Sequence, residues 1–271
     1  MRILCSIFLL FFTVTAFAAS VDTFQVFSTA MNKQIKNIVI KPDSYASEEK
    51  TFPTVYLLHG AFGNHKDWLT KVPAILEYAD QHEILIVCPD GGFNTWYFDS
   101  PIDPAMQYET YIAKELVAAI DSQYRTQPLK AKRAITGLSM GGHGALFLCF
   151  RHQDTYGAAG SMSGGVDLRP FPDNWNIKDR IGTYAAHPER WENNSVTNLL
   201  YLLNGATPPM MIDCGVDDFF YQVNARLHDK MVERNIAHDY IERPGKHDWN
   251  YWSNAVQYQL LFFSNFFKDE E

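Results

Sequence analysis

Short apolar runs alternate with amphipathic stretches along most of the chain, and this alternation predicts the order of its strands and helices. Runs such as Thr54-Val55-Tyr56-Leu57-Leu58, bounded by polar or turn-forming residues, are typical of buried strands. Between residues 108 and 123 the apolar positions recur at near-helical spacing, which predicts a helix. The predicted strands span 22–28, 34–41, 54–58, 84–88, 133–136, 157–162, 210–214 and a run ending at 242, and the predicted helices lie near 72–79, 108–123, 142–151 and 249–267.

This order of elements predicts an α/β fold with one mostly parallel, twisted sheet and helices on both faces. The strands at 22–28 and 34–41 follow each other closely, and we expect them to form a hairpin that runs antiparallel to the rest. A chain of 271 residues with 46% hydrophobic content can bury the core of a single domain of this class. No internal repeat or low-complexity segment is visible in the sequence.

The amino-terminal segment has the pattern of a secretory signal peptide. Met1-Arg2 gives a charged start, residues 3–17 are mostly apolar, and Ala16-Phe17-Ala18-Ala19-Ser20 supplies the small residues of a cleavage site. The apolar run is too short for a membrane-spanning helix. We therefore expect a signal peptide at 1–19 and a mature domain at 20–271 that is soluble, secreted or periplasmic, and free of the membrane after cleavage.

Charge and cysteine content narrow the range of partners. The formal net charge of −8, without a basic stripe that could neutralise phosphates, argues against nucleic acid. Once the signal is removed, Cys88, Cys149 and Cys214 remain, an odd number without metal-ligand spacing. We interpret these cysteines as small buried side chains and predict no metal site.

The strongest candidate for chemistry is Gly137-Leu138-Ser139-Met140-Gly141, which lies between a predicted strand and a predicted helix. A G-x-S-x-G sequence in this setting is a nucleophile elbow, a strained turn that lifts a serine hydroxyl clear of the sheet. The flanking positions need glycine because a side chain there would collide with the neighbouring strand and helix. A serine is a poor nucleophile alone, so Ser139 needs a base and an orienting acid.

Candidates for both partners follow the serine in the order expected for this architecture, acid first and then histidine. The strand at 210–214 runs into a loop that holds Asp217 and Asp218, and His247 lies in a turn-rich loop directly before the last helix. The carboxyl ends of parallel strands meet at one edge of the sheet, where these loops can reach Ser139. Chemistry alone does not decide whether Asp217 or Asp218 is the orienting acid. Asp213 lies within the strand and is interpreted as structural.

Two backbone N–H groups are expected to stabilise an oxyanion beside Ser139. One is the N–H of Met140, the residue after the nucleophile, and the other comes from the loop that follows the strand at 54–58. Gly60 permits a sharp turn there, which would aim the Ala61 N–H at the developing charge. His59-Gly60 alone could be an ordinary turn, but the presence of the elbow favours the functional interpretation.

Five motifs occur in order and together resemble the Putative esterase family of α/β-hydrolases. They are Leu57-Leu58-His59-Gly60, Asn64-x-x-x-Trp68, Gly137-Leu138-Ser139-Met140-Gly141-Gly142, Cys214-Gly215-x-x-Asp218-Phe219 and Pro244-Gly245-x-His247-Asp248-Trp249. That family includes feruloyl and acetyl esterases, S-formylglutathione hydrolases and mycobacterial mycolyltransferases. The resemblance spans about residues 22–268, implies the α/β-hydrolase fold, and assigns the acid to Asp218. Through 244–249, followed by Tyr251-Trp252, the chain is most similar to the secreted feruloyl-esterase-like members.

Between residues 164 and 209 the strand and helix rhythm breaks, and prolines mix with aromatic residues. We interpret this segment as an insertion that folds over the active site as a small cap, although an ordinary long connection is the simpler alternative. Its Trp175, together with Phe62, Trp96 and Tyr97 from earlier loops, is predicted to line a substrate pocket.

These observations predict a secreted serine carboxylesterase that hydrolyses small-molecule or polysaccharide esters, with feruloyl or acetyl groups on carbohydrate as the expected substrates. Ser139 would attack the ester carbonyl, His247 would move the proton, and Asp218 would hold the imidazole. This chemistry requires no metal or organic cofactor. A short-chain acyl esterase, an S-formylglutathione-hydrolase-like thioesterase and acyl transfer to a sugar stay open as alternatives. In a different class, a catalytically inactive hydrolase fold could serve as a binding module.

Overall fold

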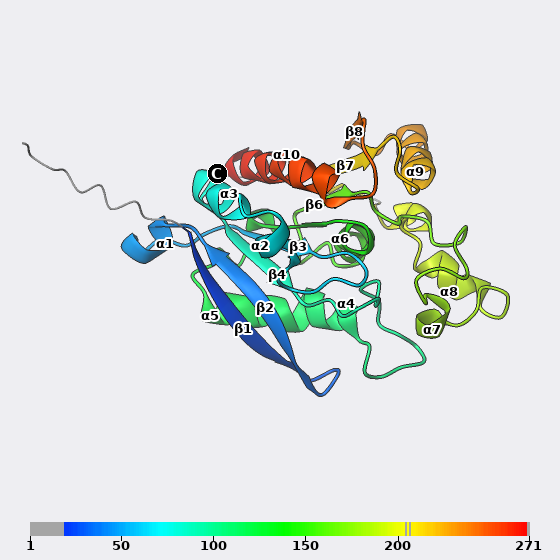
Figure 1. Ribbon diagram of the computed structural model, residues 1–271, viewed down its shortest axis with the longest axis horizontal. Coiled ribbons are helices and arrows are strands. Elements are labelled where there is room, and N and C mark those ends of the chain that lie inside the picture. The colour runs from blue at the N-terminus through cyan, green and yellow to red at the C-terminus, as the bar shows by residue number, and fades with distance from the viewer. Residues whose placement is uncertain (1–18, 204, 206, 270–271) are drawn as a thin grey trace, which may run out of the picture.

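A single eight-stranded sheet organises the part of the chain that the computed structural model describes, residues 19–203, 205 and 207–269 (Figure 1). The strand order across the sheet is β1-β2-β4-β3-β5-β6-β7-β8. The strands are β1 (Ser20–Ser28), β2 (Lys33–Lys41), β3 (Thr54–Leu58), β4 (Leu85–Pro89), β5 (Arg133–Gly137), β6 (Ala158–Met162), β7 (Met210–Gly215) and β8 (Asp239–Arg243).

The pairing of the strands confirms a mostly parallel sheet with an antiparallel hairpin at one edge. β1 pairs antiparallel with β2, and β2 pairs antiparallel with β4. From β4 through β3, β5, β6 and β7 to β8, every neighbouring pair is parallel. The carboxyl ends of these parallel strands therefore share one edge of the sheet, as an α/β-hydrolase fold requires.

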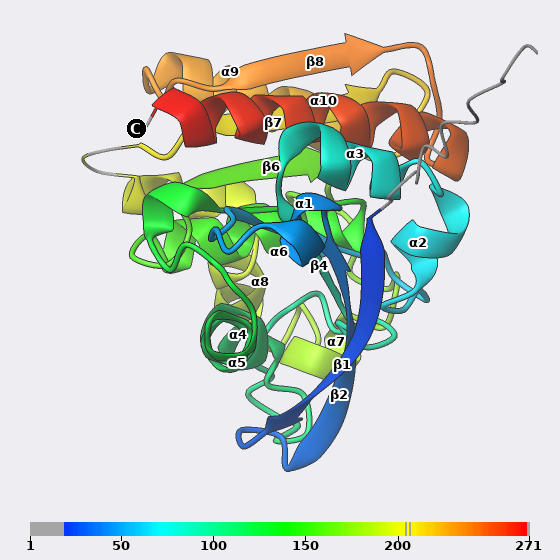
Figure 2. The ribbon, with the colours of Figure 1, turned by 90° about the vertical axis from the view of Figure 1, so that its left-hand side faces the viewer.

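Helices cover both faces of the sheet, so its central strands are buried on both sides. In β3, Val55 and Leu57 belong to one core cluster, and Tyr56 and Leu58 belong to the other. This period of two is that of a strand, whose successive side chains point to opposite faces. The first cluster packs against α2 (Asp67–Lys71), α3 (Ile75–His82) and α10 (Trp249–Asp269), and the second packs against α4 (Tyr108–Thr110), α5 (Val117–Gln123), α6 (Met140–Arg151) and α9 (Tyr221–Glu233). Figure 2 shows α3 lying beside α10.

The helix predicted near 72–79 is present as α3, but it begins three residues later, at Ile75, and ends at His82. A separate short helix, α2, ends just before it at Lys71. Pro73 explains the break, because a proline disfavours helical conformation in the residue before it and cannot donate a backbone hydrogen bond. Val72 accordingly adopts φ −131° and ψ 71°.

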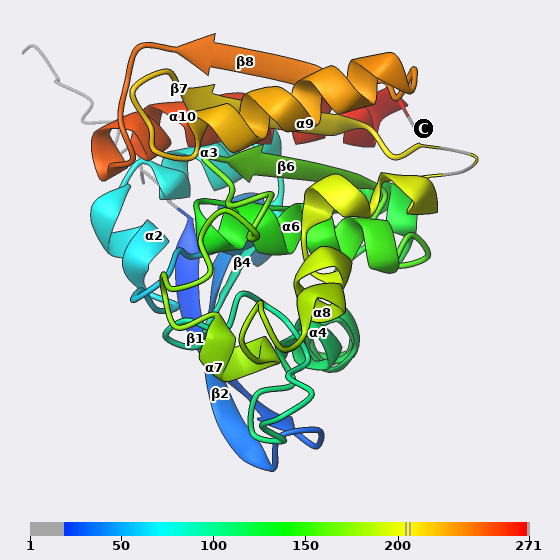
Figure 3. The same cartoon turned by 90° about the vertical axis from the view of Figure 1, so that its right-hand side faces the viewer.

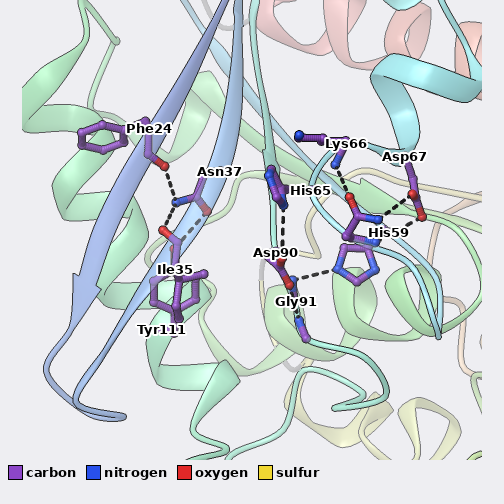
Figure 4. A network of polar contacts seen from close by, with 12 residues as sticks. Phe24, Ile35, Asn37, His59, His65, Lys66, Asp67, Asp90, Gly91 and Tyr111 are labelled. Atoms are coloured by element: carbon purple, nitrogen blue, oxygen red, sulfur yellow. Dashed lines mark hydrogen bonds and ion pairs between the residues drawn. The ribbon is translucent and has the colours of Figure 1, made fainter.

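The helix predicted at 108–123 is present, but its middle is a π-helical stretch, η1 (Tyr111–Leu116), between α4 and α5. From η1 the Tyr111 hydroxyl donates to Asn37 Oδ1 at 2.9 Å. Asn37 Nδ2 in turn donates to the carbonyls of Phe24 and Ile35, as Figure 4 shows. Asn37 is fully buried, so these bonds satisfy its amide and fix the hairpin against the helical layer.

The segment after β6 contains short helical turns and packs against the loop that follows β4. Its elements are α7 (Lys178–Ile181), α8 (Pro188–Asn193) and the 3₁₀ turns η3 (Val196–Asn198) and η4 (Leu200–Leu202), and the remaining short helices of the chain are α1 (Ser44–Ser47) and η2 (Lys130–Lys132). Arg180 donates to Asn94 Oδ1 at 2.7 Å, and Ser100 Oγ donates to the Arg180 carbonyl at 2.6 Å. Figure 3 shows α7 and α8 next to the segment leading into α4. These contacts hold the segment against the rest of the domain.

The three cysteines of the described chain are buried, as expected from the sequence. Cys88, Cys149 and Cys214 are buried free thiols, and burial raises the pKa of the Cys149 thiol to about 12. The predicted signal peptide at 1–19 lies, except for Ala19, outside the described residues. Within the described ranges, no helix combines the length and apolar character needed to span a membrane.

Candidate active site

Ser139 occupies a strained turn between β5 and α6. Its backbone has φ 55° and ψ −116°, a conformation that side-chain-bearing residues rarely adopt. The turn fits only because its flanking residues are glycine. A Cβ on Gly137 would lie 2.7 Å from the Leu58 carbonyl oxygen, and one on Gly141 would lie 2.6 Å from the same atom. The predicted reason for both glycines is thus confirmed.

Three side chains form a continuous hydrogen-bonded line at this turn. His247 Nε2 lies 2.9 Å from Ser139 Oγ, so the unprotonated Nε2 accepts a hydrogen bond from the serine hydroxyl. On its other side, His247 Nδ1 lies 2.8 Å from Asp218 Oδ2 and 3.0 Å from Asp218 Oδ1. A carboxylate can only accept, so Nδ1 carries the hydrogen and Nε2 is left free to act as a base. This is the geometry of a serine nucleophile with its base and orienting acid.

The structure also distinguishes the three neighbouring aspartates. The Asp218 side chain is fully buried and faces His247, and its Oδ1 also accepts the Phe220 N–H at 2.7 Å. Asp217 is exposed, and its N–H donates to the Gly245 carbonyl at 3.0 Å. Asp213 is buried within β7 and binds Arg243 and Tyr251 instead. Among these three, only Asp218 reaches the histidine.

Aromatic side chains enclose the His247 ring. Phe219 packs on it with ring centroids 4.1 Å apart, and Trp252 and Phe220 meet it edge-on at 4.8 and 5.4 Å. Only 14% of the histidine side chain is exposed. Packing on several sides restricts the ring to one orientation, which keeps Nε2 aimed at Ser139.

The backbone donors expected for an oxyanion are placed beside the nucleophile. Met140 is the first residue of α6, so its N–H lies at the positive end of the helix dipole. Ala61 lines the same cavity as Ser139. Within the described residues, neither N–H donates to another protein group. Both are thus free for a ligand oxygen.

The His59-Gly60 motif gives no sign of a role for the His59 side chain, which nevertheless fixes the peptide that carries the Ala61 N–H. The Gly91 N–H donates to His59 Nε2 at 2.8 Å, so the hydrogen of this neutral ring is on Nδ1, which donates to the Gly60 carbonyl at 2.7 Å. The Gly60 carbonyl and the Ala61 N–H belong to one planar peptide and point in opposite directions. Anchoring the carbonyl therefore orients the donor. Burial lowers the pKa of His59, which favours the neutral ring that this arrangement needs. Figure 4 shows the contact between His59 and Gly91.

A cavity of about 260 Å³ opens above Ser139. Two pairs of packed aromatic side chains lie at this cavity. Phe62 packs against Phe93 with centroids 4.8 Å apart, and Trp175 stacks on Phe219 at 5.8 Å with an interplanar angle of 22°. Phe62 and Phe219 remain 53% and 54% exposed. The described lining consists of Gly60, Ala61, Phe62, Gly63, Asp67, Leu138, Ser139, Trp175, Phe219, His247, Trp249 and Trp252.

Of the four predicted pocket residues, Phe62 and Trp175 line this cavity, whereas Trp96 and Tyr97 do not. Both have positive φ, 57° and 61°, and the turn they make directs their side chains into the core. Tyr97 packs under α6, where a Cβ on Gly144 would lie 2.4 Å from its ring, and its hydroxyl donates to the His59 carbonyl at 3.0 Å. Trp96 lies behind Trp175, with ring centroids 5.7 Å apart. The prediction that Trp96 and Tyr97 contact substrate is therefore wrong, and they support the wall from behind.

Comparison with known proteins agrees with this geometry. The sequence model of the Putative esterase family matches residues 28–263. The chain belongs to the Putative esterase family. It is a carboxylic ester hydrolase with the α/β-hydrolase fold.

Three similar proteins illustrate the range of this esterase family. An acetyl esterase of Caldicellulosiruptor saccharolyticus is 26% identical over 80% of this chain and 86% of its own length. A diacylglycerol acyltransferase/mycolyltransferase, Ag85A of Mycobacterium gordonae, is 33% identical over 88% of this chain and 78% of its own. The solved structure of a ferulic acid esterase is 29% identical, with a TM-score of 0.80 over 93% of this chain and 100% of its own.

We expect His59→Ala to lower the kcat of the esterase by roughly ten- to a hundredfold, because losing one oriented oxyanion donor costs about that much or more. KM should change little, since the bond to the oxyanion strengthens in the transition state. Steady-state kinetics on p-nitrophenyl acetate measure both constants.

His152→Ala is the matched control, because His152 binds Glu109 at the far end of α6. Urea unfolding would verify that each variant is folded. An unchanged kcat in folded His59→Ala would contradict a role in orienting Ala61.

Proposed function

We propose that this esterase is an exported serine carboxylesterase that hydrolyses carbohydrate-linked feruloyl or acetyl esters through Ser139, His247 and Asp218. The observation that carries the proposal is the 2.9 Å contact between His247 Nε2 and Ser139 Oγ, with Asp218 bound to the opposite ring nitrogen. A binding module would have no need for this alignment beside two free backbone donors. The alternative of an inactive fold is accordingly disfavoured.

The proposed reaction has two steps. Ser139 Oγ attacks the ester carbonyl while its proton passes to His247 Nε2, and the Ala61 and Met140 N–H groups bind the tetrahedral oxyanion. His247 then protonates the departing alcohol, leaving an acyl group on Ser139. Water attacks this acyl-enzyme with His247 again as base, and its collapse releases the acid and restores the serine. Asp218 holds the imidazole and stabilises its cation throughout.

Aromatic side chains support a substrate with flat groups. Phe62 and the stacked pair Trp175 and Phe219 line the cavity and offer faces that an aromatic acyl group or a sugar ring can pack against. Similarity to a ferulic acid esterase and to an acetyl esterase supports the same two acyl classes. The modest volume of about 260 Å³ keeps a short-chain acyl esterase as the second candidate.

Asp218→Asn tests the proposed acid against its neighbour. We expect it to lower kcat by roughly three to four orders of magnitude, because an uncharged amide no longer stabilises the imidazolium or selects its tautomer. Asp217→Asn is the matched control, since Asp217 is exposed and its side chain does not contact His247. Equal losses in the two variants, or none in either, would refute the assignment, and Ser139→Ala sets the background rate.

Substrate class is tested by the rate of ferulate release from methyl ferulate, measured beside p-nitrophenyl acetate. Fast ferulate release would support a feruloyl esterase whose aromatic walls bind the acyl group. Turnover of the acetate alone would favour the short-acyl candidate.

Phe62→Ala should separate the two activities. We expect it to lower ferulate release about tenfold while changing acetate release less, since roughly 1–1.5 kcal/mol of aromatic contact is lost.

Export is a separate part of the proposal and rests on the sequence of residues 1–19. Expression of the full chain in a bacterial host followed by amino-terminal sequencing of the periplasmic or secreted protein should give a chain beginning at Ala19 or Ser20. Recovery of the protein only from the cytoplasm, still beginning at Met1, would contradict export.

A further inference from the structure

One charged side chain lines the catalytic cavity without taking part in the proposed reaction. Asp67 is the first residue of α2 and is half-buried among the lining residues. Its carboxylate accepts the Asn64 N–H and the Asn64 side-chain amide, each at 3.2 Å. A Cβ on Gly63 would lie 2.3 Å from Asp67 Oδ2, so the carboxylate folds back over the loop that carries Ala61.

No cation offsets this negative charge inside the described part of the cavity. Its described lining contains no lysine or arginine, and none of the ion pairs among the described residues includes Asp67. The nearest lysines in sequence to Asp67 and His247 are Lys66 and Lys246, which are exposed and are not among the lining residues. The chain as a whole also carries a formal net charge of −8. A ligand in the cavity therefore experiences an uncompensated negative charge.

We propose that Asp67 gives the cavity charge selectivity, so that its substrates are neutral or cationic esters and anionic esters are rejected. This proposal rests on the proposed esterase reaction at Ser139. A carboxylate repels an anionic substrate and attracts a cation or a hydroxyl donor at short range, and a partly desolvated cavity strengthens both effects. The aromatic rings that line the same cavity add attraction for a cation but none for an anion.

Asp67 thereby separates two classes of ester. A sugar hydroxyl offers Asp67 a hydrogen-bond donor and brings no charge. Glutathione thioesters carry a net negative charge at neutral pH. The described lining of the cavity contains no lysine or arginine that could bind their carboxylates. The specificity of the site is thus set by repulsion from Asp67 as well as by aromatic contact.

The test uses three aryl acetates that differ in the charge of the leaving group. They are 4-acetoxybenzoate, which is anionic, 4-acetoxybenzamide, which is neutral, and 4-acetoxyphenyl trimethylammonium, which is cationic. For each enzyme, kcat/KM of the charged ester is divided by kcat/KM of the neutral one. Comparing these ratios between variant and parent cancels the intrinsic reactivity of each ester.

Asp67→Asn removes the charge and keeps the shape and one acceptor oxygen for the Asn64 N–H. We expect the anionic-to-neutral ratio to rise about fivefold and the cationic-to-neutral ratio to fall about fivefold, as a unit charge at close range in a medium of intermediate dielectric implies. The parent should hydrolyse S-formylglutathione slowly, and the variant should hydrolyse it faster relative to the neutral acetate. Asp217→Asn, which removes the same charge outside the cavity lining, should leave all ratios unchanged.

Opposite shifts for anion and cation are a readout that loosening of the loop would not produce. If both ratios moved together in Asp67→Asn, or if Asp217→Asn moved them equally, the proposal would be overturned. Labelling of Ser139 by a neutral fluorophosphonate keeps the two proposals apart. Failure to label the parent would mean that the serine is not activated, whereas efficient labelling with unchanged ratios would reject charge selection alone.

Discussion

The close approach of the elbow to the end of β3 is the constraint on which the rest of the site depends. The Leu58 carbonyl accepts the Leu138 N–H at 3.3 Å and the Trp68 Nε1–H at 3.0 Å, and it leaves no room for a Cβ on Gly137 or Gly141. One carbonyl thus fixes the nucleophile turn, the start of the oxyanion loop and the helix α2 relative to one another. Because it is buried and fully bonded, a shift of any of these three parts would leave a polar group unsatisfied.

From this point the site is held by peptide geometry and by aromatic packing. His59 fixes the Gly60–Ala61 peptide, and Tyr97 in turn donates to the His59 carbonyl from beneath. Around the imidazole of His247, Phe219 and Trp252 supply apolar walls that reduce its contact with water. Electrostatic interactions are stronger where water is excluded, so the same packing that orients the base also strengthens its bond to Asp218.

Much of this could be predicted because it is encoded in local sequence. The elbow glycines, the order of Ser139, acid and His247, and the apolar strands all follow from short patterns, and the strand bounds differ from those observed by at most two residues. Only the family resemblance distinguishes the catalytic acid, because Asp217 and Asp218 are adjacent and differ only in the direction in which the turn points their side chains. Pro73 marks the break between α2 and α3, which the spacing of apolar residues alone does not show. The sequence cannot show that Trp96 and Tyr97 turn inward, because the positive φ values that turn them leave no signal in it. The roles of the His59 and Asp67 side chains cannot be predicted from the sequence, because they depend on contact with Gly91 and on a shared cavity, which only the fold brings together.

Asp213 shows why a buried carboxylate near the catalytic residues need not be one of them. Burial raises the pKa of Asp213, although the bonds from Tyr251 and Arg243 act to lower it. These bonds therefore serve mainly to offset the free-energy cost of burying the charged carboxylate. The contacts of Asp213 join β7, β8 and α10 close to the loops that carry Asp218 and His247.

Two backbone hydrogen bonds also join these two loops directly. The Val216 N–H donates to the Arg243 carbonyl at 2.9 Å, and the Asp217 N–H donates to the Gly245 carbonyl at 3.0 Å. Gly215 permits this contact, because a Cβ there would lie 2.4 Å from the Gly245 carbonyl oxygen. The acid and the base are therefore on segments bound to each other, which is why their separation can be held at hydrogen-bond length across 29 residues of sequence.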